Sequence, residues 1–98
     1  GRSYAPLVQK IQALTSEASC LQYAGLSNAQ VAALLYHGHV QLRKVDRPSA
    51  DCPWLLVDSE QVDALSDTLK ALGWAQAQRV LRPTDNNETL VLFKPTQD

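Results

Sequence analysis

Two histidines, a cysteine and an aspartate are the side chains of this sequence best suited to metal binding. His37 and His39 flank Gly38, and Asp51 and Cys52 follow in a loop. A zinc or copper site would combine both histidines with Cys52 or Asp51, but histidines two positions apart at a helix end do not share one face. A histidine that contacts the last carbonyls of a helix is the simpler interpretation. We therefore expect no metal and no cofactor.

The two cysteines, Cys20 and Cys52, lack the paired CxxC spacing of a zinc site. Either a disulfide in an oxidising compartment or two buried thiols would account for them. The carboxylate of Asp51 disfavours the thiolate that a nucleophilic Cys52 would need. The glycines stand at positions 1, 25, 38 and 73, so there is no glycine-rich phosphate loop. We expect no catalytic residues and no enzyme activity.

An Arg-Pro pair occurs twice, as Arg47-Pro48 and Arg82-Pro83. Proline at these positions is suited to the turns where strands end. Two symmetry-related arginines are also suited to clamping an anionic ligand or the carboxylates of a partner.

The chain is nearly neutral, with 9 Lys and Arg against 10 Asp and Glu. This balance disfavours the strong basic field on which non-specific nucleic-acid binding depends. The charges nevertheless separate by element. Basic residues gather in expected strands and turns (Arg43, Lys44, Arg47, Arg79, Arg82, Lys94), and acidic residues gather on one expected helix (Asp58, Glu60, Asp63, Asp67). An acidic helix face could dock a basic partner and the basic strands could bind nucleic acid, but a solvated helix face explains the acids more simply.

Apolar runs are far shorter than the roughly 20 residues that cross a bilayer, so we expect no membrane span. The sequence opens Gly1-Arg2-Ser3 without methionine. We interpret it as a segment cut from a larger, bacterial-type protein.

The periodicity of apolar residues predicts three helices, one further short helical piece and four strands. Pro6 precedes Leu7, Val8, Ile11 and Leu14, which share one helical face, and Cys20 to Ala24 is interpreted as a further short helical piece that Gly25 ends. The remaining expected elements are a helix over 28–37 capped by Ser27, a strand within 39–45, a strand over 54–57, a helix from Asp58 or Ser59 to Gly73, and strands over 74–81 and 89–93.

The second half of the sequence repeats the order of the first. Identical residues recur 35 positions apart: Gly38 and Gly73, Gln41 and Gln76, Val45 and Val80, Arg47 and Arg82, Pro48 and Pro83, Leu55 and Leu90. The expected helices match at a shift of 31, so the second helix is longer by about one turn. This pattern predicts a duplicated α-β-β unit.

Two α-β-β units predict an α+β fold of the ferredoxin-like kind. In this two-layer sandwich, four antiparallel strands carry two helices on one face, preceded by an N-terminal amphipathic helix. The expected organisation is a helix and linker over 1–26 and a duplicated domain over 27–98, with repeats at 27–57 and 58–94.

The strand pattern also predicts a second apolar face on the sheet. Val40, Leu42, Ala75 and Ala77 are expected to face the two repeat helices, which leaves Gln76, Val45 and Val80 on the other side. Either the N-terminal helix covers this second face, or it continues upstream as a linker or coiled coil and another protein covers the face. The residues predicted to contact a partner are Val45, Val80, Arg47, Arg82, Trp54 and Phe93.

These observations favour a non-enzymatic protein-interaction or assembly module that forms a homodimer or docks a protein partner by its sheet face or edge. The order of elements over about 27–94 is similar to that of the periplasmic domains of assembly-platform proteins in type II secretion and type IV pili. That resemblance, which carries no motif residues, implies a ferredoxin-like domain that dimerises. Nucleic-acid binding through Arg43 and Arg79 is the alternative, and a small-molecule enzyme with a deep pocket is the third.

Overall fold

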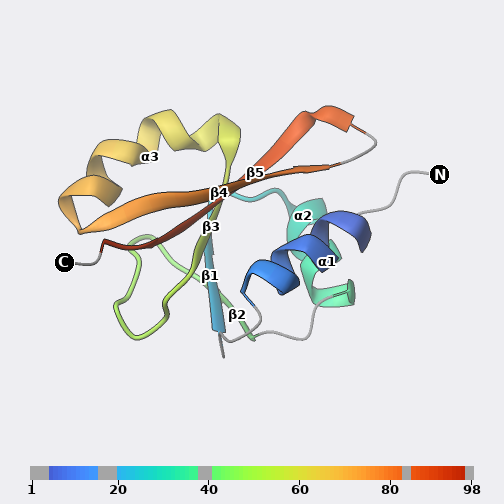
Figure 1. Ribbon diagram of the computed structural model, residues 1–98, viewed down its shortest axis with the longest axis horizontal. Coiled ribbons are helices and arrows are strands. Elements are labelled where there is room, and N and C mark those ends of the chain that lie inside the picture. The colour runs from blue at the N-terminus through green and yellow to red at the C-terminus, as the bar shows by residue number, and fades with distance from the viewer. Residues whose placement is uncertain (1–4, 16–19, 38–40, 83–84, 97–98) are drawn as a thin grey trace.

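A computed structural model describes residues 5–15, 20–37, 41–82 and 85–96 as a mixed α+β fold. The elements in chain order are α1 (Ala5–Leu14), β1 (Cys20–Ala24), α2 (Asn28–His37), β2 (Gln41–Lys44), β3 (Leu55–Asp58), α3 (Ser59–Ala71), β4 (Trp74–Arg82) and β5 (Asp85–Pro95). Figure 1 shows helices on both sides of one twisted sheet. Within the described residues, no helix combines the length and apolar character needed to cross a membrane.

Within the part of the chain that the structure describes, the sheet has five strands in the order β2-β1-β3-β5-β4. Strands β2, β1 and β3 are parallel, and β5 runs antiparallel to both β3 and β4. The prediction of a four-stranded antiparallel sheet is therefore wrong. The two α-β-β segments also differ in pairing, because β4 and β5 form a hairpin whereas β1 separates β2 from β3.

The strand missed by the sequence analysis is β1, which was expected to be helical. Leu21 and Tyr23 pack on the sheet face that carries α1 and α2, and Ala24 packs on the face that carries α3. Gln22 between them is fully buried. A central strand covered on both faces lacks the alternation of apolar and polar residues that marks a strand in a sequence.

The helices divide between the two faces of the sheet (Figure 1). One buried cluster contains Leu7, Val8 and Ile11 of α1 and Leu34 of α2. Another contains Val62 and Leu69 of α3. The strands alternate between them. The strands contribute to the first cluster the side chains of Leu56, Val80, Leu90 and Leu92. They contribute to the second those of Leu55, Val57, Val91 and Phe93. The prediction that both repeat helices lie on one face is wrong.

The direction of each crossover explains this division. From β1 through α2 to β2 the chain moves one way along the sheet, and from β3 through α3 to β4 it moves the other way. Crossovers between parallel strands share one hand, so opposite directions place their helices on opposite faces. The segment 45–54 carries the chain from β2 past β1 to β3.

The helix ends follow the sequence prediction. Ser27 and Gln30 form a reciprocal cap at the start of α2: Gln30 N donates to Ser27 Oγ at 3.2 Å, and Ser27 N donates to Gln30 Oε1 at 2.8 Å. Asp58 caps α3 by accepting from Glu60 N at 2.9 Å. Gly73, with φ of +84°, turns the chain from α3 into β4. These three ends are confirmed.

Helix α1 covers one face of the sheet, which is the first of the two alternatives for the N-terminal helix. Its Leu7, Val8 and Ile11 are buried, and they pack in the cluster that contains Val80. The segment expected to be a helix and linker thus contributes both α1 and the central strand β1 to the same core as the residues after 27.

A bulge in β4 changes which side chains share a face. Gln76 pairs with Phe93 and Gln78 pairs with Leu92, so Ala77 is an additional residue on the β4 side. Gln76 therefore lies on the α3 face with Phe93, whereas Val80 lies in the cluster under α1. The prediction that Gln76 and Val80 share a face is wrong because it assumed unbroken alternation. Val45, expected beside Val80, packs against the cluster on the α3 face.

Candidate functional site

A groove between α3 and β4, with a volume of about 330 Å³, is the candidate site. Its floor is formed by the buried side chains of Val62, Trp74 and Phe93. The remaining lining residues are Ser66 and Lys70 from α3, Ala75 and Gln76 from β4, and Thr96 after β5. The groove therefore offers an apolar floor with a polar rim, which is the composition of a binding surface.

The local sequence places these side chains. Val62, Ser66 and Lys70 are spaced by four residues and so form one line along α3. The turn at Gly73 then brings the chain back as β4, and Thr96 N donates to Gly73 O at 2.6 Å, which fixes the end of β5 beside the turn. Lys70 thus lies at the end of the groove where β4 begins.

Strand β4 is an edge of the sheet. In an antiparallel pair, alternate residues direct their N–H and C=O groups away from the partner strand. Thr96 N donates to Gly73 O, so these two residues form a hydrogen-bonded pair. In this register Ala75 directs its backbone groups to Lys94. Trp74 and Gln76 direct theirs to the open edge. Pro95 lies opposite Trp74, where the β5 strand needs no N–H donor.

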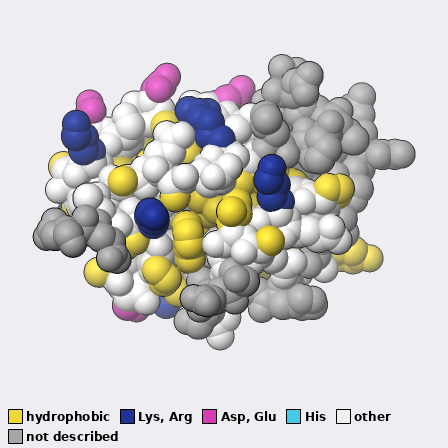
Figure 2. Space-filling view, viewed as in Figure 1, with side chains coloured by type: hydrophobic (Ala, Val, Ile, Leu, Met, Phe, Trp, Pro, Cys, Tyr) yellow, Lys and Arg dark blue, Asp and Glu magenta, His cyan; other side chains and the backbone are white. Residues whose placement is uncertain are grey.

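Charge is distributed unevenly around the groove. Among the described residues that line the groove, Lys70 is the one ionisable side chain, and it is exposed. Figure 2 shows a strip of apolar side chains bordered by several Lys and Arg side chains, with acidic side chains at the margin of the view. Helix α3 exposes Glu60, Asp63 and Asp67, none of which lines the groove. The groove itself therefore favours an anionic ligand group at its Lys70 end.

The six side chains predicted to contact a partner do not form one surface. Val80 is fully buried under α1, and Phe93 lies in the groove floor on the opposite face. Val45 and Trp54 are half-buried, and they pack against the α3-face cluster and the α1/α2-face cluster respectively. Arg47 is exposed, and the side chain of Arg82 lies outside the described residues.

Arg43 and Arg79, the side chains chosen for nucleic-acid binding, lie on opposite edges of the sheet, in β2 and β4. Arg43 is paired with Asp51, with Nη1 3.1 Å from Oδ1. The strands therefore do not bring these two arginines together as one basic patch.

Lys70, Trp74 and Gln76 were not among the site residues predicted from the sequence. The four-residue spacing that ends at Lys70 and the aromatic residue directly after Gly73 are visible in the sequence. That β4 is an edge strand is visible only once the strand order is known.

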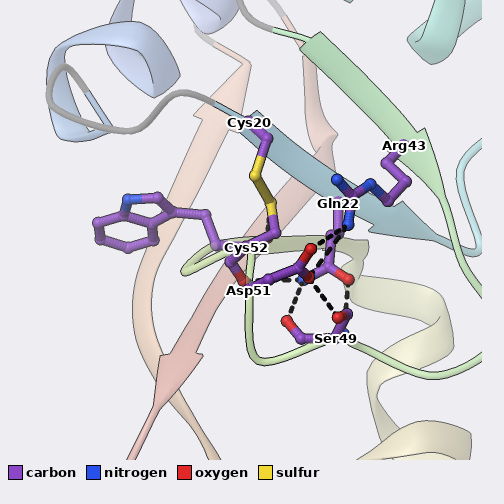
Figure 3. Close-up of polar contacts among 7 residues, drawn as sticks. Cys20, Gln22, Arg43, Ser49, Asp51 and Cys52 are labelled. Carbon is purple, nitrogen blue, oxygen red and sulfur yellow. Dashed lines mark hydrogen bonds and ion pairs between the residues drawn. A yellow bond between two sulfur atoms is a disulfide. The ribbon is translucent and has the colours of Figure 1, made fainter.

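A second group of polar contacts holds the segment 45–54 against the sheet (Figure 3). The buried amide of Gln22 donates from Nε2 to Cys52 O at 2.9 Å and to Ser49 O at 3.1 Å, and its Oε1 accepts from Ser49 N at 2.6 Å. A disulfide joins Cys20 of β1 to Cys52, with the Cα atoms 5.9 Å apart. All of these contacts are internal to the fold, which gives the group a structural role.

Asp51 lies at the exposed end of the same group. The Ser49 hydroxyl donates to its carboxylate and the Arg43 guanidinium lies beside it, and these contacts lower the pKa of Asp51 below its ordinary value. Cys52 is not available for the metal site weighed from the sequence, because its sulfur is in the disulfide. His39 and the side chain of His37 lie outside the described residues, and no cluster of three potential ligands occurs among the residues described.

A second hollow, of about 420 Å³, lies where β1 and β3 end and the chain departs in opposite directions. Ligands often bind at such a point in α/β sheets. Here, however, Gln30 Nε2 donates to Asp58 Oδ2 at 2.7 Å, and Asp58 Oδ1 caps α3. Gln61 also closes on Gly25, where an added Cβ would lie 2.8 Å from its Cγ. The carboxylate of Asp58 is thus engaged within the fold by Gln30 and by the start of α3.

Comparison with protein-family models, with curated proteins and with solved structures found no match to this chain.

Proposed function

We propose that this chain is a non-enzymatic protein-interaction module that binds an extended segment of another protein by adding it as a strand to β4. The observation that supports this function is the apolar groove directly beside the outward-facing backbone groups of Trp74 and Gln76. Main-chain hydrogen bonds supply affinity in this mode, and adjacent pockets for side chains supply specificity.

The two edges of the sheet differ in their suitability for strand addition. Strand β2 has four residues, its Gln41, Arg43 and Lys44 are exposed, and charged side chains discourage pairing at an edge. Strand β4 has nine residues and borders the groove. Its bulge at Ala77 ends the regular stretch, so the added strand pairs with Trp74 to Gln76 only.

The proposed function is tested by selecting binders from a phage-displayed library of random dodecapeptides on the disulfide-bonded chain. Ser66→Trp fills the groove from its α3 wall, and Thr68→Trp places the same side chain at an exposed position of α3 outside the groove. We expect selected peptides to lose binding to Ser66→Trp and to retain it on Thr68→Trp. Selection of no peptide, or of peptides that bind both variants equally, contradicts the proposal.

A second copy of the chain is another source of an extended strand. Light scattering at low and high protein concentration measures this directly. A monomer at both concentrations agrees with a segment of a different protein as the occupant. A dimer that Ser66→Trp dissociates would replace that occupant with β4 of a second copy.

A further inference from the structure

We propose that the segment bound at β4 carries an apolar side chain and a carboxylate two residues apart, the apolar one over the groove floor and the carboxylate beside Lys70. This inference rests on the proposed function and specifies the chemistry of the partner.

The spacing follows from the register of the open edge. An added strand forms its hydrogen bonds with Trp74 and Gln76, whose backbone groups face outward. Residues directly opposite each other in paired strands place their side chains on the same face of the sheet. Trp74 and Gln76 lie on the α3 face. The two partner residues opposite them, separated by one residue, therefore place their side chains in the groove.

The two ends of the groove differ in chemistry. At the Trp74 end, Lys70 precedes the Gly73 turn and contributes the positive charge. Toward Gln76, the floor consists of Phe93, which pairs with Gln76 in the sheet, and Val62. The partner residue opposite Trp74 thus lies at the end of the groove that carries the ammonium group, and the residue opposite Gln76 lies at the uncharged end.

The direction of the added strand sets the order of the two partner residues along its chain. In an antiparallel strand, the residue opposite Gln76 comes first in the chain and the residue opposite Trp74 follows. Antiparallel pairs are slightly more stable than parallel pairs. We therefore expect the order apolar, any residue, acidic to bind more tightly than the reverse order.

Synthetic nine-residue peptides with capped ends and a threonine host test this chemistry. One set has Leu followed two positions later by Asp, Asn or Lys, and a second set has the reverse order. Binding to the disulfide-bonded chain is measured by calorimetry. Because Lys70 is exposed, we expect about 3- to 10-fold tighter binding for Asp than for Lys.

Lys70→Glu is the decisive variant, and Lys44→Glu on the far edge strand β2 is its control with the same change of net charge. The inference requires Lys70→Glu to prefer the Lys peptide and Lys44→Glu to retain the preference for Asp. Equal binding of Asp and Lys peptides by the original chain would overturn the inference while leaving strand addition intact. Failure of every host peptide, when library peptides still bind at β4, would overturn it as well. Failure of both the host peptides and the library would overturn the proposed function too.

Discussion

Pro95 lies directly opposite Trp74 in the β4–β5 ladder. At this position the β5 residue does not need to donate a hydrogen bond across the hairpin, so proline is accommodated without the loss of a ladder hydrogen bond. The same alternation directs the backbone of Trp74 and, two residues later, of Gln76 to the open edge of the sheet.

Proline substitutions in β4 distinguish the two sides of the strand. Ala75→Pro removes an N–H that faces Lys94 in the hairpin, and we expect it to cost about 3 kcal/mol of unfolding free energy. Gln76→Pro removes an N–H that faces outward, and we expect a cost within about 1 kcal/mol together with loss of peptide binding. Urea denaturation measures both costs. Equal losses from the two substitutions would contradict the assigned register.

The Cys20–Cys52 disulfide closes a loop with a sequence separation of 32 residues. Its removal enlarges the unfolded ensemble, and a loop of this length corresponds to about 3 to 4 kcal/mol. We expect the double variant Cys20→Ala, Cys52→Ala to lose about this much unfolding free energy in urea. Dithiothreitol provides the control, since it is expected to destabilise the original chain and to leave the double variant unchanged. No effect of reductant on the original chain would show that the disulfide contributes nothing.

Gln22 is the buried side chain whose loss most directly frees the segment 45–54. Gln22→Leu leaves Ser49 N, Ser49 O and Cys52 O without their side-chain partner, and we expect a loss of about 2 to 4 kcal/mol. Gln41→Leu on the exposed edge strand β2 is the matched control, with an expected change within about 0.5 kcal/mol. Similar urea midpoints for the two variants would argue against the clamping role of Gln22.

The lowered pKa of Asp51 makes the stability of the folded chain depend on pH, and the sign of this dependence follows from the direction of the shift. The pKa of Asp51 is lowered in the folded chain from an ordinary value of 3.8, first by the Ser49 hydroxyl and then by Arg43. Its contribution to stability is therefore present above the ordinary value and is lost as the pH falls through the lowered folded-state pKa. We expect Ser49→Ala to raise the pKa of Asp51 in a carbon-detected NMR titration. An unchanged titration in Ser49→Ala would rule out the hydroxyl as the cause.

Val80 tests whether α1 belongs to the core. Because Val80 is fully buried beneath α1, Val80→Asp places a charge in an apolar cluster, and we expect a loss of at least about 4 kcal/mol. Circular dichroism should then show a largely unfolded chain, whereas Gln78→Asp at an exposed position of β4 should stay folded. A folded Val80→Asp chain would contradict the packing of α1 on the sheet.

Local signals in the sequence predicted three helix ends correctly, although they also made the strand Cys20–Ala24 helical. Ser27 with Gln30, Asp58 and Gly73 each fix a helix end through contacts within a few residues, and such contacts leave a pattern that the sequence displays directly. The strands over 54–57 and 74–81 were also identified to within a residue or two.

Contacts between distant residues account for what the sequence analysis missed. Gln22 is stable inside the sheet because Ser49 and Cys52, 27 and 30 residues later, bind its amide. The bulge at Ala77 reverses the faces of the following residues without any local signal. The groove depends on the strand order and on the bulge. The strand order makes β4 an edge, and the bulge sets the faces that Gln76 and Val80 occupy.

Amide hydrogen exchange of β4, measured by NMR with and without a library-selected peptide, tests strand addition most directly. The proposed function predicts that the amides of Trp74 and Gln76 become protected when the peptide binds, while the amide of Ala75, already bonded to β5, changes little. Binding that leaves Trp74 and Gln76 unprotected would contradict strand addition at β4.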